Sequence, residues 1–211
     1  MASPTKPAKV ARTRMTAAER RGQLIEVARG LFAERGFEGS AIEEVANRAA
    51  VSKPVVYEHF GGKEGLYAVV VDREVTLLLS MMQEALTVGT SRELLEQAVI
   101  ALLDYIEQHP DGFRILVRDS PIGTSASFQS MIGDVATRVE GILMDAFTLH
   151  GLDSKTAPMY AQMLVGMVGT TGQWWLDTRQ PERHVVAAHL VNLAWNGLSG
   201  LEQQPELVTR G

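Results

Sequence analysis

The sequence predicts an all-α protein. Apolar residues recur at intervals of three and four residues along most of the chain, and almost no stretch alternates with a period of two. The first spacing is typical of amphipathic helices and the second of half-buried strands. The 211 residues are 45% apolar and 21% charged, and none of them is cysteine. Such a chain can bury a core without disulfides, and it lacks the thiolates of a cysteine metal site.

Charge divides the chain into two parts. Residues 1–65 contain 11 Lys+Arg and 8 Asp+Glu, whereas residues 66–211 contain 9 and 17. A basic first part and an acidic remainder predict that the two parts of the chain have different functions. Residues 1–15 carry four basic residues, including Arg12 and Arg14, with no acid and no long apolar run. They are therefore predicted to form a flexible basic arm and not a signal peptide.

A long first helix is predicted between Thr16 and Gly36. Thr16 and Glu19 have the spacing of a capping box, in which the Thr side chain accepts from the third helical N–H and the Glu carboxylate accepts from the N-cap N–H. Gly36 follows the last apolar residue of the helical pattern. A glycine at that place is typical of a helix end, where a positive φ is usual.

Two very short helices are predicted next. Ser40 and Glu43 have the spacing of a second capping box, which would open a helix of about two turns. Ser52 is the predicted N-cap of the third helix. Pro54 then falls in the first turn, where its missing N–H breaks no helical bond. The two glycines at 61–62 are predicted to end this helix.

Six longer or medium helices are predicted after residue 62, with short joints between them. Ser91 is expected to cap the second of them and Pro110 to end it. Residues 156–176 carry no charge, but their glutamines, glycines and threonines favour a buried helix of a soluble protein over a membrane span. The predicted ranges are about 63–86, 91–109, 111–119, 128–150, 156–178 and 181–198.

Two short helices joined by a tight turn, behind a longer helix, form a helix-turn-helix, whose second short helix enters the major groove of DNA. The Ser52 hydroxyl and the first amides of that helix can meet a phosphate. Lys53 can bind a phosphate or a guanine edge, and the Tyr57 hydroxyl can bind a phosphate. Pro54 and Val55 have no side-chain donor, so they are expected to contact thymine methyl groups.

Five further residues are predicted to contact DNA, four from positions around that helix and His59 from the helix itself. Ser40 and Lys63 stand at predicted helix N-termini, where they would hold the phosphate backbone on either side. Arg12 and Arg14 would add backbone or minor-groove contacts, and the alternative for the arm is an inert tail. For His59, DNA contact and an exposed side chain without a function remain equal alternatives.

Residues 16–67 resemble the DNA-binding domain of the TetR family of bacterial transcriptional regulators. The text that carries the resemblance is LFAERGFEGSAIEEVANRAAVSKPVVYEHFGGKEGLY. It implies a flexible arm at 1–15, a helix-turn-helix DNA-binding domain at 16–62, and a helical ligand-binding and dimerisation domain at 63–211. Ala50 stands where the family usually has glycine, so a strained positive φ is expected there.

The C-terminal part is rich in methionine and large apolar residues, which predict an adaptable apolar cavity for an effector. The alternative for each residue is an ordinary core position. The pattern LVGMVG…WWLD…LAWNGLSGL loosely resembles an actinobacterial branch of the family that includes lipid-metabolism regulators, and this implies an acyl or lipid-like effector. The predicted lining residues are Met82, Leu102, Phe113, Leu116, Phe128, Met131, Phe147, Met163, Met167 and Trp174.

Three glycines, Gly166, Gly169 and Gly172, recur in one predicted helix, although each costs about 1 kcal/mol against alanine. A close helix crossing at a dimer interface, or room for a ligand, would offset that cost. The last two helices resemble the dimerisation pair of the family, so the resemblance implies a homodimer with a self-complementary interface.

The sequence therefore predicts a cytoplasmic, ligand-responsive repressor that binds a palindromic double-stranded DNA operator as a homodimer, with no cofactor, no metal and no membrane partner. An enzyme is disfavoured because the five histidines are scattered and no Walker, paired-carboxylate or nucleophile motif occurs. The alternative is a ligand-binding protein of the same fold without specific DNA binding. A steep loss of DNA affinity with rising salt would separate the two.

Overall fold

The computed structural model describes residues 15–117 and 128–206 of the 211-residue chain. The predicted arm contacts, Arg12 and Arg14, lie outside the described residues. Within the described ranges the regular structure is α-helical apart from one short 3₁₀ turn, Ser154–Thr156. The all-α prediction is confirmed.

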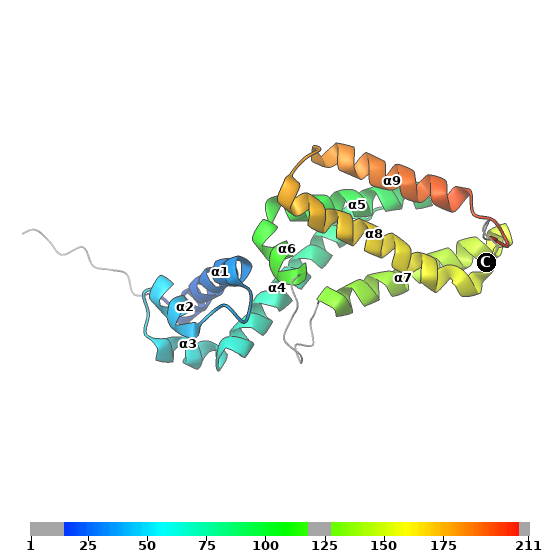
Figure 1. The fold of residues 1–211 in the computed structure, drawn as a ribbon. Helices are drawn as coiled ribbons and strands as arrows, with labels where there is room; N and C mark the ends of the chain where they lie inside the picture. Colours follow the sequence, from blue (N-terminus) through cyan, green and yellow to red (C-terminus); the bar gives the residue numbers. More distant parts are fainter. Residues whose placement is uncertain (1–14, 118–127, 207–211) are drawn as a thin grey trace, which may run out of the picture.

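Three helices form one end of the molecule: α1 (Ala17–Arg35), α2 (Ile42–Arg48) and α3 (Lys53–Phe60) (Figure 1). The next helix, α4 (Lys63–Ala85), starts beside α3 and runs into the rest of the chain. It packs against α1 at one end and against α5 and α6 at the other. Helix α4 therefore links α3, which is predicted to contact DNA, to α5 and α6, which carry some of the residues predicted to bind the effector.

The other helices form an elongated bundle. In Figure 1, α5 and α9 lie side by side at one edge, and α7 and α8 run antiparallel towards the end where the 3₁₀ turn joins them. Their bounds are α5 (Ser91–Gln108), α6 (Pro110–Val117), α7 (Phe128–His150), α8 (Ala157–Thr178) and α9 (Arg183–Ser199).

Buried apolar residues fall into two clusters. The larger one is continuous and takes residues from α1 to α6, from the C-terminal part of α8 and from α9. The smaller one lies at the joint of α7 and α8 and is built from Leu143, Phe147, Ala157 and Ala161. Since α1, α2 and α3 share the larger core with the later helices, movement of those helices can reach α3 through direct packing.

A buried carboxylate joins four helices inside the larger core. Glu74 of α4 is only 5% exposed. Its Oε1 accepts from Nε of Arg29 in α1 at 2.6 Å, and its Oε2 accepts from the hydroxyl of Tyr105 in α5 at 2.7 Å. A Cβ atom at Gly112 in α6 would lie 1.8 Å from Glu74 Oε2, so only glycine leaves room there. We call these four residues the Glu74 network.

The predicted start and end of the first helix are confirmed. The Thr16 N–H donates to Glu19 Oε2 at 2.7 Å, and the Glu19 N–H donates to Thr16 Oγ1 at 3.2 Å, which completes the capping box. Gly36 ends α1 with φ 74°. The two glycines at 61–62 also have positive φ and separate α3 from α4, as predicted.

Two capping predictions are wrong. The N-cap of α2 is Ala41 and not Ser40, because the Ser40 hydroxyl turns inward and donates to the Gly36 carbonyl at 2.6 Å. The N-cap of α5 is Thr90 and not Ser91, since the Thr90 side chain pairs with Glu93 in a capping box. The spacing of Thr90 and Glu93 carried that signal in the sequence.

The described helices do not meet the requirements of a membrane span. None of them is long and apolar enough to cross a bilayer. The uncharged segment at 156–176 forms most of α8, which packs against α5, α7 and α9.

Candidate nucleic-acid interface

The turn at residues 49–52 fixes the angle between α2 and α3. Ala50 adopts φ 54°, the positive value expected for the position where the sequence departs from glycine. The next N–H, of Val51, donates to the Ala46 carbonyl at 2.9 Å and so closes the end of α2. Gln23 of α1 donates to the carbonyl of residue 49, which ties the turn to the first helix.

The helix α3 is held by its inner face. Val56 is fully buried in the larger core. Gly61 ends the helix with φ 74°, and its N–H donates to the Tyr57 carbonyl at 2.8 Å. A Cβ at Gly65 would lie 2.0 Å from the Phe60 carbonyl oxygen, so the corner between α3 and α4 also requires a glycine. The outer face of α3 is thus presented by a rigid support.

Three of the predicted contact residues on α3 are exposed: Lys53, Pro54 and Tyr57, the last with 45% of its surface accessible. Val55 and His59 are half-buried, and Val55 packs against the larger core. The exposed residues lie at the N-terminal end and the middle of α3, which is the part of a recognition helix that reaches base edges.

Ser52, Ser40 and Lys63 have different surroundings from one another. Ser52 is the N-cap of α3, as predicted, and its side chain makes no capping hydrogen bond. Ser40 is only 4% exposed and its hydroxyl donates to backbone carbonyls, so this geometry contradicts the predicted phosphate contact. Lys63 Nζ donates to the Phe37 carbonyl at 3.0 Å and lies 4.1 Å from the centre of the Phe37 ring.

Lys53 has an acidic partner that the sequence analysis did not single out. Its ammonium group forms an ion pair with the carboxylate of Glu43 in α2, and it lies 5.5 Å from the centre of the Tyr57 ring. The hydrogen bond from Lys53 lowers the pKa of Glu43, and the bond to Glu43 raises the pKa of Lys53. Both side chains are therefore charged around neutral pH.

Arg21 is a second residue that the sequence analysis missed. Its Nη1 donates to the His59 carbonyl at 3.1 Å, and its guanidinium lies 4.5 Å from the centre of the Phe60 ring. Arg21 thus braces the end of α3 from α1. Its position on the exposed side of the first helical pattern gave no sequence signal for this contact.

The residues predicted to line an effector cavity do not gather at one place. Phe113 and Leu116 are buried in the larger core, whereas Phe147 is buried in the smaller one. Met163 and Trp174 are 54% and 53% exposed. The other three described members, which pack against the larger core from half-buried positions, are Met82, Leu102 and Met167. The side chains of Phe128 and Met131 lie outside the part that the structure describes.

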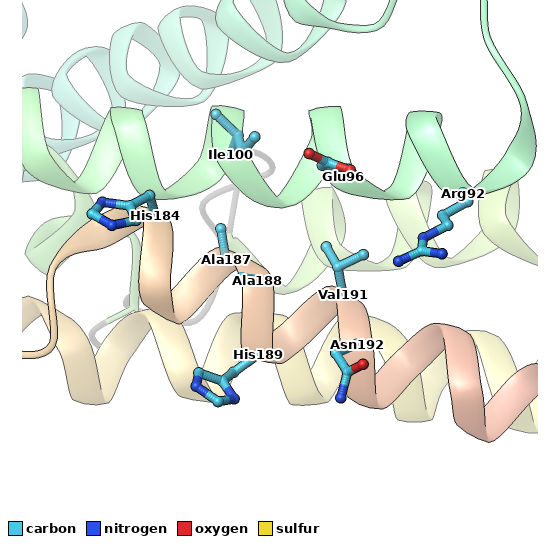
Figure 2. Close-up of a pocket in the computed structure, with 9 residues that line it drawn as sticks. All are labelled: Arg92, Glu96, Ile100, His184, Ala187, Ala188, His189, Val191 and Asn192. Carbon is cyan, nitrogen blue, oxygen red and sulfur yellow. The ribbon is translucent and has the colours of Figure 1, made fainter.

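A groove with a volume of about 480 Å³ lies between α5 and α9. Figure 2 shows Ala187 and Val191 pointing from α9 towards α5, while His189 and Asn192 point the other way. None of the predicted effector residues lines this groove. Its walls also include Arg92, Glu96, Ile100, His184 and Ala188.

Two family models match the chain. A model described as bacterial regulatory proteins of the tetR family matches residues 24–70, which include all of α2, the turn and α3. A model described as the tetracyclin repressor-like C-terminal domain matches residues 91–197, just over half of the chain. The chain belongs to the TetR family.

Individual TetR-family relatives agree with this assignment. The HTH-type transcriptional activator FasR of Mycolicibacterium smegmatis is 33% identical over 184 residues, which cover 86% of this chain and 84% of that protein. The HTH-type transcriptional repressor SCO4008 of Streptomyces coelicolor is 29% identical over 96 residues, covering 46% and 47%. A TetR-like regulator from Rhodococcus sp. RHA1 superposes with a TM-score of 0.70 at 26% identity, covering 89% of this chain and 100% of that one. The chain is therefore a TetR-family transcriptional regulator with a DNA-binding domain.

Proposed function

We propose that this regulator binds a palindromic DNA operator as a homodimer and that a small apolar effector modulates the binding. Residues 16–62 would contact the operator, with the arm at 1–15 beside them, and residues 63–211 would dimerise and bind the effector. The observation that supports this most directly is the geometry of α3. Its inner face is locked by buried Val56, while Lys53, Pro54 and Tyr57 are presented outward at the end that enters a major groove.

The contacts follow from the chemistry of those side chains. Lys53 donates to a phosphate or to guanine O6 and N7, and the Tyr57 hydroxyl donates to a phosphate. Pro54 presses against a thymine methyl group. Ser52 and the first N–H groups of α3 face a phosphate at the positive end of the helix dipole. Two copies of α3 would lie in successive major grooves, about 34–36 Å apart.

Selection of binding sites from a random duplex pool tests the operator. A palindromic consensus is expected, and the double variant Lys53→Ala, Tyr57→Ala should then bind it at least tenfold more weakly with unchanged helical content. Lys155→Ala is the matched control, because it removes a cation from the joint of α7 and α8. No enrichment at low salt by a folded protein would favour the ligand-binding alternative, since specific and non-specific DNA binding both strengthen as salt falls.

The dimer is proposed to form through α8 and α9. On α9 the apolar Leu193 is exposed, and on α8 a Cβ at Gly166 would meet nothing within 4 Å. Leu193→Asp should shift the protein towards monomer in sedimentation equilibrium and weaken operator binding. Val88→Asp makes the same kind of change at a 97% exposed residue between α4 and α5 and should leave the dimer intact.

The effector is proposed to be an apolar molecule such as an acyl chain. The exposed methionines and Trp174 on α8 support an apolar partner, and the emission of the three tryptophans, of which Trp174 is 53% exposed, supplies the readout. Titration with acyl compounds of graded length should change the tryptophan emission and the operator affinity over the same concentration range. A change in emission without a change in operator affinity would contradict an effector role.

The sign of regulation is proposed from the sequence as repression. Among the relatives named above, FasR is called an activator and SCO4008 a repressor. Transcription in vitro from a template that carries the selected operator measures the sign directly. Less transcript with added protein supports repression, and more transcript replaces it with activation without affecting the proposed operator contacts.

A further inference from the structure

The described part of the DNA-binding end holds little free positive charge. Residues 15–65 contain seven Lys+Arg and eight Asp+Glu, so their formal charge is −1. Every one of the seven cations has a protein partner within hydrogen-bonding reach. The pairs are Arg20 with Gln23, Arg21 with the His59 carbonyl, Arg29 with Glu74, Arg35 with Glu44, Arg48 with Glu34 and Glu44, Lys53 with Glu43, and Lys63 with the Phe37 carbonyl.

The Lys53–Glu43 pair differs from the others because it lies beside the exposed side of α3, which carries Lys53, Pro54 and Tyr57. We call this side the reading face and α3 the reading helix. Lys53 is the first residue of α3, and Glu43 is the second residue of α2. Their side chains are 46% and 59% exposed, so both charged groups reach the surface where DNA is proposed to lie. The pair holds across the turn of the helix-turn-helix and brings a carboxylate next to the cation that would meet DNA.

A carboxylate at that place acts differently on two kinds of duplex. On a duplex of unrelated sequence, Lys53 can gain only a phosphate contact. That contact either breaks the pair with Glu43 or, if the pair stays, brings a negative phosphate close to a negative carboxylate. On the operator, guanine O6 and N7 accept from Lys53 while Glu43 stays beside it or accepts from a cytosine amino group. Repulsion against the wrong partner is a common source of specificity.

We propose that Glu43 is a specificity-determining residue, whose carboxylate holds Lys53 away from phosphates and so weakens binding to DNA other than the operator. The inference rests on the proposed function, because it needs α3 to be the reading helix. Glu43 acts through Lys53 and is thus a positioning residue. Its effect should appear in the salt dependence of non-specific DNA binding. A change in the stability of the fold alone would not alter that salt dependence.

The test compares Glu43→Gln with Glu26→Gln in the full-length protein. Glu26→Gln removes the same charge from α1, but Glu26 faces Arg73 of α4 at 3.8 Å and not the reading helix. Each variant is titrated with the selected operator and with a duplex of equal length and scrambled sequence, over a range of salt. Glu43→Gln should bind the scrambled duplex up to about fivefold more tightly per recognition helix. The operator affinity should change less, so the ratio of the two affinities falls.

The salt dependence gives the sharper result. A freed Lys53 adds one phosphate contact per protomer, so the slope of log K against log salt on the scrambled duplex should steepen by about 0.9 for each recognition helix. In a Lys53→Met background, Glu43→Gln should leave that slope unchanged. The proposal is overturned if the slope does not steepen, if Glu26→Gln has the same effect, or if the effect persists without Lys53.

The failure of this inference can be told apart from a failure of the proposed function. If the unmodified protein selects no operator, the proposed function fails before Glu43 is tested. If it selects an operator and Glu43→Gln keeps the discrimination ratio, only the role of Glu43 fails. Melting temperatures of all variants, which should agree with the parent because both glutamates are exposed, exclude a folding defect as the cause.

Discussion

The Glu74 network and the far end of the α7–α8 pair are built in opposite ways. At the network, four helices meet on one buried carboxylate whose two oxygens are both hydrogen-bonded within the chain. At the joint of α7 and α8, four buried residues form a small separate core, and Leu149 next to it is 81% exposed. Satisfied polar groups surrounded by close packing hold one arrangement, whereas exposed apolar surface leaves room for another partner.

The difference shows where this regulator is fixed by its own contacts and where it is not. Arg29 belongs to the helix that supports the reading helix, and Tyr105 and Gly112 belong to the bundle. The Glu74 network therefore fastens the DNA-binding end to the bundle through a directional contact as well as through apolar packing. Leu149 and the smaller core lie at the other end of α7 and α8, on helices that are proposed to meet a second copy or an effector.

Removing the carboxylate at the network should have the largest effect. Glu74→Ala leaves the Arg29 guanidinium and the Tyr105 hydroxyl without their acceptor, which should lower the free energy of unfolding by about 3 kcal/mol in urea denaturation. Asp145→Ala removes an exposed carboxylate from α7 and should change stability by less than about 0.5 kcal/mol. Equal losses in the two variants would contradict the contrast between the regions.

The α-helical fold and the form of the reading helix could be predicted from the sequence because their signals are local. A capping box at Thr16, a proline in the first turn of α3 and a positive φ at Ala50 each depend on a few neighbouring residues. The capping prediction failed at Ser40 because its hydroxyl donates to the carbonyls of Leu31 and Gly36, in and at the end of α1. Only the folded chain places these carbonyls beside Ser40.

The junction and the charge pair on the reading face depend on contacts between distant residues. Glu74 lies three and four residues from buried Val71, Val70 and Leu78, so a charged residue on the apolar face of α4 was a visible signal. No signal in the sequence indicated its partners Arg29 and Tyr105, which are 45 and 31 residues away. The effector prediction grouped Phe113 with Phe147 by composition, but α7 and α8 carry Phe147 into a separate core.

Two glycines of α8 offer a matched comparison, in which smaller changes in the free energy of unfolding are expected. A Cβ at Gly172 would lie 2.8 Å from Ile106 Cδ1 in α5, whereas a Cβ at Gly166 would meet nothing within 4 Å. Gly172→Ala should therefore lower the free energy of unfolding by about 1 kcal/mol, because the Ile106 side chain must move. Gly166→Ala should raise it by up to about 1 kcal/mol through helix propensity.

These glycine variants also test where the proposed dimer interface lies. If Gly166 lies where two copies of α8 cross closely, Gly166→Ala should weaken dimerisation in sedimentation equilibrium. The free energy of unfolding of the protomer should rise at the same time. Gly172→Ala should leave the dissociation constant of the dimer within twofold. An unchanged dimer in both variants would place the crossing elsewhere on the exposed faces of α8 and α9.

The last comparison separates the hydrogen bond of Tyr105 from its packing. Tyr105→Phe keeps the ring and removes the hydroxyl that donates to Glu74, so it should lower the free energy of unfolding by about 1 kcal/mol at pH 8. Burial, and next the nearby Glu74 charge, raise the pKa of Tyr105 above its usual range. The folded protein therefore keeps the Tyr105 proton at pH values where the unfolded chain loses it.

The sign of the resulting pH dependence follows from that proton. The stability contributed by the protonated hydroxyl is fully present below the unfolded pKa of about 10 and declines as the pH rises above it, by about 1.4 kcal/mol per pH unit. Phenylalanine has no such proton, so the difference in stability between the parent and Tyr105→Phe should shrink above pH 10 and reverse near pH 11. Urea denaturation of both proteins at pH 8, 10 and 11 measures this difference, from which the titration of all other groups cancels. A constant difference across that range would mean that the unfolded and folded chains release the Tyr105 proton together, and the hydroxyl would then not be held by the buried carboxylate.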